Sequence, residues 1–67
     1  MERLKELRWL KVLTLRELEE ISGVSYATIH RLERGHKDAR PSTIRKLARA
    51  LDVDPAELLA TKERDDG

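Results

Sequence analysis

Apolar residues recur every three or four positions along most of the chain and never alternate for long. This spacing is typical of amphipathic helices and not of half-buried strands, so it predicts an all-α fold. We expect five short helices, over residues 2–11, 15–21, 26–33, 41–51 and 55–61.

Capping residues mark where these helices begin and end. Thr14, followed three positions later by Glu17, predicts a capping box at the start of the second helix. Gly23 predicts the end of that helix, because glycine adopts the left-handed conformation without strain. Ser25 is then the N-cap of the third helix, and Pro41 suits the first position of the fourth.

The first helix is expected to bury one apolar face. Leu4 and Leu7 should point inward, together with Leu10 or the stem of Lys11. Trp9 should be half-buried against the 55–61 helix, because the first helix is short and the chain has only one other aromatic residue. A role of Trp9 in self-association is the alternative.

Two helices joined by a short turn that contains a glycine form a helix-turn-helix, and the 15–21 and 26–33 helices match this description. The wedge between them is expected to consist of the apolar residues of both helices and the turn. These are Leu18, Val24, Ile29 and Leu32. The rest of the 26–33 helix should therefore face solvent, although it carries an aromatic ring, an imidazole and guanidinium groups.

Charge is unevenly distributed along the chain. Residues 1–24 carry no net charge, residues 25–49 carry +5 and residues 50–67 carry −4, which sum to the overall +1. A basic middle segment indicates an anionic partner.

Several classes of protein do not fit the sequence. There is no apolar run of membrane-spanning length, and the absence of cysteine favours a reducing, cytoplasmic setting. His30 and His36 lie six positions apart with no third ligand, so no metal site or cofactor is expected. A chain of 67 residues with no catalytic motif does not easily enclose a substrate pocket, so we expect neither an enzyme nor a small-molecule binder.

The segment TLRELEEISGVSYATIHRLERG resembles the lambda-repressor-like (Cro/repressor or XRE type) helix-turn-helix domains, and PSTIRKLARALDVDPAELL resembles the last two helices of the same family. The resemblance covers about residues 3–60. It implies a compact five-helix fold and sequence-specific binding of double-stranded DNA through the 26–33 helix in the major groove. It also implies a transcriptional regulator of the repressor type that associates with the nucleoid.

The resemblance assigns roles to individual residues. Base edges would be contacted from the start of the 26–33 helix and one turn further along, by Tyr26, Ala27, His30 and Arg31. The DNA backbone would be contacted by Thr28, Arg34, Lys37 and Arg40. Arg8 and Glu33 would form a structural ion pair.

Two positions depart from the family pattern. Leu15 stands where the family often has a glutamine that contacts a phosphate, so that contact is not expected here. Glu19 stands where the family usually has a small residue that allows close approach of the helices.

The expected organisation is one DNA-binding domain over residues 1–61 and a frayed acidic tail over residues 62–67. Since one such module makes a small contact with DNA, we expect a homodimer on a two-fold site. Two alternatives share this fold: an antitoxin-like or other protein-interaction role, and an isolated or designed recognition module without effector function.

Overall fold

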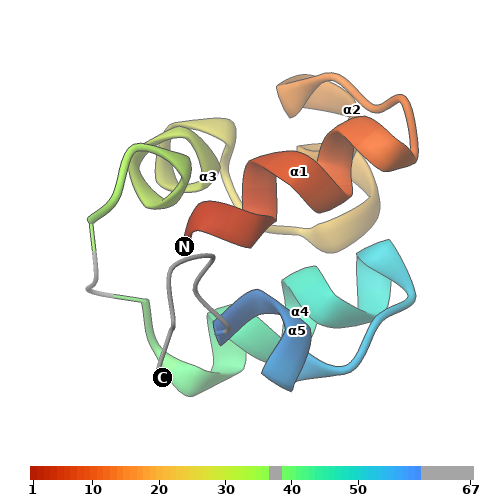
Figure 1. Cartoon of the computed structure of the whole chain (residues 1–67). Coiled ribbons are helices and arrows are strands. Elements are labelled where there is room, and N and C mark those ends of the chain that lie inside the picture. The colour runs from red at the N-terminus through yellow and green to blue at the C-terminus, as the bar shows by residue number, and fades with distance from the viewer. Residues whose placement is uncertain (37–38, 60–67) are drawn as a thin grey trace.

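The computed structural model describes residues 1–36 and 39–59, and these ranges form five helices and no strand (Figure 1). The helices are α1 (Glu2–Leu10), α2 (Leu15–Ser22), α3 (Tyr26–Glu33), α4 (Pro41–Leu51) and α5 (Pro55–Leu59). The predicted all-α, five-helix fold is confirmed.

The predicted boundaries differ from the observed ones by at most one residue wherever the structure describes them. The helix α1 ends at Leu10, one residue earlier than expected, and α2 extends to Ser22, one residue further. The limits of α3 and α4 are as predicted. The predicted last two residues of α5 and the 62–67 tail lie outside the described residues.

The helices pack around one core. In Figure 1, α1, α2 and α3 occupy the upper part of the molecule, and α4 and α5 lie below them. The helix α1 contacts α3 and α5, while α4 contacts α2 and α5. The buried apolar residues come from every helix and from the α2–α3 turn: Leu4, Leu7, Leu18, Val24, Ile29, Leu32, Leu47, Ala48, Leu51 and Leu58. All four residues of the predicted wedge are among them.

The predicted caps of the helix-turn-helix are present. Thr14 Oγ1 accepts a hydrogen bond from the Glu17 amide at 3.0 Å, and Glu17 Oε1 accepts one from the Thr14 amide at 2.8 Å. Gly23 follows α2 with φ of 79°, the left-handed conformation that ends the helix. The turn between α2 and α3 is therefore specified by residues that the sequence already identifies.

The expected orientation of α1 is wrong at two residues. Trp9 is 61% exposed and Leu10 is 70% exposed, and neither belongs to the core. The reason is Arg8, which is buried beside Leu4 and Leu7 on the inward face of the helix. Each residue turns the helix by about 100°, so the two positions after Arg8 point away from the core.

The corner between α1 and α2 is unusual because a valine occupies a position where glycine is usual. Val12 has φ of 54°, its amide donates to the Trp9 carbonyl at 2.9 Å, and the Leu13 amide donates to the Arg8 carbonyl at 3.2 Å. These two bonds form a Schellman motif, in which the left-handed residue is most often glycine. The corner therefore holds a β-branched residue in a strained conformation.

Across residues 1–36 and 39–59, no helix is long and apolar enough to span a membrane.

Candidate nucleic-acid interface

The helix α3 has one buried side and one exposed side. Ile29 and Leu32 are buried in the core, and Thr28 is half-buried. The remaining side chains that the sequence predicts to face outward are exposed: Tyr26, Ala27, His30, Arg31 and Arg34. The predicted division of this helix is confirmed, and its exposed side is polar and basic.

The start of α3 is fixed by Ser25 and Thr28. Ser25 Oγ accepts a hydrogen bond from the Thr28 amide at 3.3 Å and donates one to Thr28 Oγ1 at 3.0 Å. The Thr28 hydroxyl accepts in this second bond, so its own hydrogen can be donated to another oxygen. Ser25 thus caps the helix as predicted and also orients a predicted DNA-backbone contact.

The end of α3 is held by the ion pair between Arg8 and Glu33. Arg8 Nε donates to Glu33 Oε2 at 2.6 Å and a terminal nitrogen of Arg8 donates to Glu33 Oε1 at 3.0 Å, which makes the pair bidentate. The two side chains are 8% and 4% exposed. The other terminal nitrogen donates to the Leu13 carbonyl at 2.8 Å, so one guanidinium joins α1, the α1–α2 corner and α3. The expected pair is present, and the third contact is one that the sequence did not predict.

Tyr26 contacts the neighbouring helix through an arginine. The guanidinium carbon of Arg16, in the first turn of α2, lies 4.3 Å from the centroid of the Tyr26 ring. This is within the range of a cation–π contact. Arg16 was not singled out from the sequence, because nothing in the spacing shows that the first turn of α2 meets the first residue of α3.

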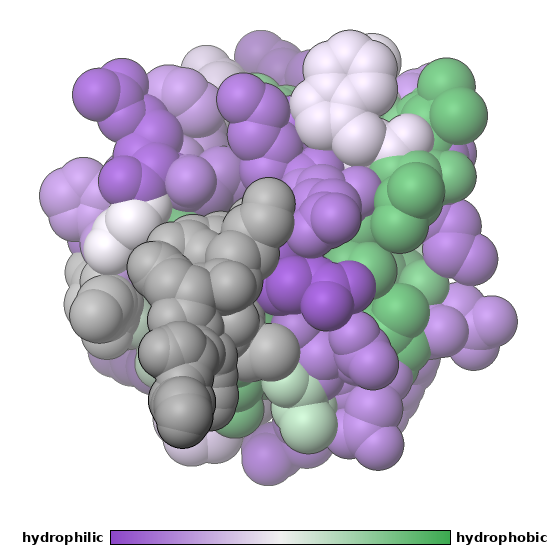
Figure 2. Space-filling model, viewed as in Figure 1, coloured by the Kyte–Doolittle hydropathy of each residue, from purple (hydrophilic) through white to green (hydrophobic). Residues whose placement is uncertain are grey.

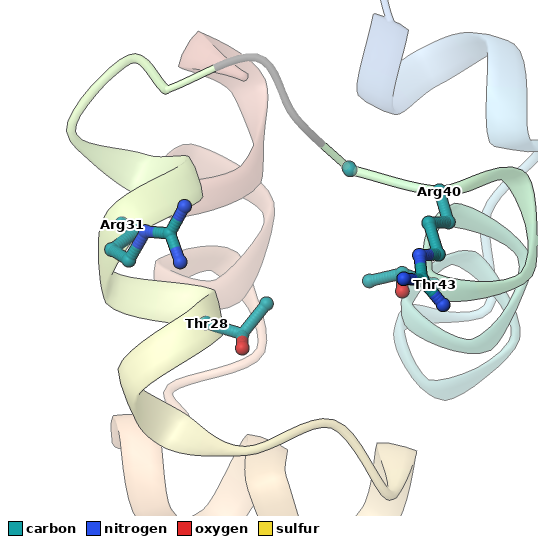
Figure 3. Close-up of a pocket in the computed structure, with 5 residues that line it drawn as sticks. Thr28, Arg31, Arg40 and Thr43 are labelled. Atoms are coloured by element: carbon teal, nitrogen blue, oxygen red, sulfur yellow. The ribbon is translucent and has the colours of Figure 1, made fainter.

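A cleft of about 330 Å³ separates α3 from the start of α4. It is lined by Thr28, Arg31, Ala39, Arg40 and Thr43. Figure 3 shows Thr28 and Arg31 pointing from α3 toward the start of α4, where Arg40 and Thr43 lie. Two guanidinium groups and two hydroxyl groups therefore border the same hollow.

The first turn of α4 borders this cleft through Arg40 and Thr43. Arg40 is the N-cap residue but its side chain makes no capping hydrogen bond, and Pro41 occupies the first turn. The first amides of an α-helix have no partner within the helix and carry a partial positive charge. The cleft is thus suited to an anion. Thr43 was not predicted, although its place just after Pro41 in a predicted helix start was a usable signal.

Two remaining positions concern the loop after α3. Lys37 lies outside the described residues, so its predicted contact is not tested. His36 is exposed, and within the described ranges no group of three or more histidines and carboxylates is arranged to hold a metal ion.

A profile of the helix-turn-helix family matches residues 4–58, which is most of the chain. The chain belongs to this helix-turn-helix family. It falls in the lambda-repressor-like, XRE-type branch, as the sequence resemblance suggested.

Two curated relatives of this helix-turn-helix chain come from Bacillus subtilis (strain 168). The uncharacterized HTH-type transcriptional regulator RghRB is 42% identical over 60 residues, which make up 88% of this chain and 43% of the relative. The HTH-type transcriptional repressor RghR is 45% identical over 53 residues, which make up 78% of this chain and 39% of the relative. The chain therefore spans about two fifths of the length of these relatives.

A solved structure also matches this helix-turn-helix chain. It is the crystal structure of the restriction-modification controller protein C.AhdI from Aeromonas hydrophila, with a TM-score of 0.80 and 40% sequence identity. The match covers 85% of this chain and 86% of that protein. The similarity thus extends over the arrangement of the helices and not only over the helix-turn-helix segment.

Proposed function

We propose that the chain binds double-stranded DNA sequence-specifically through α3 in the major groove and acts as a transcriptional regulator of the repressor type. One observation carries this proposal: the exposed side of α3 is polar and basic, and it borders a cleft whose other wall is the start of α4. Base edges in the major groove offer hydrogen-bond acceptors, and phosphates flank them. The names of the relatives, which are transcriptional regulators and a controller protein, support the same function.

In this proposal the base contacts come from Tyr26, Ala27, His30 and Arg31. All four are exposed on α3. Arg31 donates in a fork to guanine O6 and N7, which is the commonest specific contact of arginine with DNA.

The phosphate contacts come from Thr28, Arg34, Lys37 and Arg40. Thr28 and Arg40 lie on opposite walls of the cleft, which suits a phosphate placed between α3 and the first turn of α4. Phosphate contacts contribute most of the affinity and make it salt-dependent, whereas base contacts determine the site.

A single module of this size buries roughly 600–1,000 Å² on DNA, which limits its affinity. We therefore propose a homodimer on a two-fold site, with half-sites about one helical turn apart. No catalytic activity is proposed.

Selection from a random duplex pool at near-physiological salt tests this function. A palindromic consensus would support specific recognition by a dimer, and a single short motif would support a monomer. Failure to enrich any sequence, with binding that disappears as salt rises, would overturn the proposal and favour a role in binding a protein partner.

Arg31→Ala tests the assignment of a base contact. We expect a loss of about 1–3 kcal/mol on the selected site and a relaxed preference at one base pair. Arg49→Ala is the matched control, because Arg49 is exposed in the last turn of α4, about 12 Å from Pro41 along the helix axis. An equal loss of affinity for all duplexes would reassign Arg31 to the DNA backbone.

A further inference from the structure

The stack between Arg16 and Tyr26 connects the first turn of α2 to the first residue of α3. Both residues are exposed, and Tyr26 is 41% exposed even with the guanidinium against its ring. The core does not determine the orientation of this ring, because the buried side of α3 begins at the next turn, with Ile29. The contact with Arg16 covers part of the ring and restricts its orientation.

The chemistry of the guanidinium allows a second contact at the same time. Its N–H donors lie in the plane of the group, whereas the contact with an aromatic ring uses its face. Arg16 can therefore remain stacked on Tyr26 while its edge donates to a phosphate beside the groove.

The surface next to this stack is apolar in an otherwise polar region. Tyr26 offers the uncovered part of its ring, and Ala27 follows with an exposed methyl group. In the major groove the apolar group on a base edge is the C5-methyl of thymine. The two neighbouring side chains at the start of α3 thus match a thymine in chemical character.

We propose that Arg16 is a positioning residue that holds the Tyr26 ring against the C5-methyl group of a thymine in the recognised site. This inference rests on the proposed DNA-binding function and deepens it. The stack restricts the ring to one orientation before binding, so that contact with the methyl group does not require the ring to be ordered on DNA. Without Arg16 the ring remains at the interface but no longer distinguishes thymine by its methyl group.

The experiment uses the selected duplex and a set of duplexes in which each thymine in turn is replaced by uracil, which removes only the methyl group. For the wild-type chain we expect one thymine whose replacement weakens binding about fourfold, which corresponds to burial of one methyl group. Tyr26→Ala should abolish the sensitivity to uracil at that position.

The variants Arg16→Gln and Arg16→Lys distinguish the stacking of Arg16 on the Tyr26 ring from the contribution of its charge to DNA affinity. Both should reduce the uracil effect at that position to less than twofold, since glutamine and lysine lack the planar cation that covers the ring. Arg16→Lys should retain the salt dependence of the wild type, whereas Arg16→Gln should lower the salt slope by about one. Arg49→Gln is the matched control and should leave the fourfold uracil effect unchanged.

The outcomes distinguish this inference from the function on which it rests. If no duplex is enriched by the wild-type chain, the proposed function fails first. If a site is enriched but Arg16→Gln weakens every duplex equally and retains the fourfold uracil effect, Arg16 is a phosphate contact alone and the positioning role is wrong. If the wild-type chain is insensitive to uracil at every thymine, the proposed contact with a methyl group is wrong. Thermal unfolding of each variant verifies that these exposed substitutions leave the fold intact.

Discussion

Glu33 ends α3 with a carboxylate that is buried against the guanidinium of Arg8. Removing one partner of a buried ion pair leaves the other charge without compensation, which costs about 3–5 kcal/mol. A domain of this size has a total stability of roughly 3–10 kcal/mol, at 0.05–0.15 kcal/mol per residue. The pair is therefore important to the fold even though it contributes no apolar contact.

We expect Glu33→Ala to lower the free energy of unfolding by about 3–5 kcal/mol, measured by urea denaturation. Glu20→Ala is the matched control, because Glu20 is exposed on α2 and its removal should change stability by about 0.5 kcal/mol or less. Replacing both partners, as Arg8→Met with Glu33→Leu, should restore most of the loss, since the desolvation penalty disappears together with the pair. A Glu33→Ala variant as stable as the Glu20→Ala control would contradict the assigned importance of the pair.

The same pair shows what could and could not be predicted for individual residues. Its existence follows from the family resemblance, and the exposed side chains of α3 follow from helical periodicity. The exposure of Trp9 and Leu10 was not predicted, because the expectation that apolar residues face inward did not allow for a buried charged residue at Arg8. Because the paired side chain of Arg8 is buried, the second half of α1 is oriented differently from the expectation.

At the scale of elements, the helix ends were predictable wherever side chains cap them. Thr14 with Glu17, Gly23 and Ser25 all act as the sequence indicated. The end of α1 was missed by one residue because Val12 occupies a position where glycine would have been the signal. The cleft between α3 and α4 was not predictable either, since it depends on how the core places these two helices relative to one another, which helical periodicity does not specify.

The strained corner gives a prediction about stability. Val12→Gly should stabilise the chain by about 0.5–1 kcal/mol, because relief of the left-handed strain exceeds the added entropy of glycine in the unfolded chain. For a domain of this size that corresponds to a rise of several degrees in the midpoint of thermal unfolding, about 4–8 °C per kcal/mol.

Val12→Ala is the control for this change. It removes the β-branch but keeps the Cβ, so its gain should be less than half that of glycine. If the alanine and glycine variants unfold at the same temperature, the left-handed conformation of residue 12 is not a source of strain.

For the whole molecule, the placement of charge predicts how salt affects binding. The segment 25–49 carries a net charge of +5, and it includes both arginines of the cleft. We expect Arg40→Ala to weaken binding to every duplex and to lower the slope of log affinity against log salt by about one. Binding titrations at several salt concentrations measure this slope. A slope equal to that of the wild type would show that Arg40 does not contact a phosphate.

The proposed homodimer is tested at the same scale. Leu59, the last described residue of α5, is exposed and follows the buried Leu58, so it is an apolar side chain outside the core. The face in Figure 2 is mostly polar, and its apolar side chains gather mainly in a stripe along the right edge. If α5 contributes to the dimer, Leu59→Gln should reduce cooperative binding to the two-fold site and leave affinity for an isolated half-site within about twofold.

Leu10→Gln, at an exposed leucine of α1, is the matched control for that substitution and should retain cooperativity. Equal loss of cooperativity in both variants would place the contact between the two copies at α1 as well. Unchanged cooperativity in the Leu59 variant would exclude its contribution to the dimer.

The two-sided character of α3 also has a consequence for how this domain can diverge and be redesigned. Ile29, Leu32 and Glu33 hold the helix in place, and the side chains at its exposed surface are not part of the core. Replacing these surface residues by those of another helix-turn-helix domain should therefore change the DNA sequence that is preferred, while the domain remains folded. Arg16 limits this exchange, because it belongs to α2 and contacts Tyr26, the first residue of α3. A new residue at position 26 must therefore be chosen together with the residue at position 16.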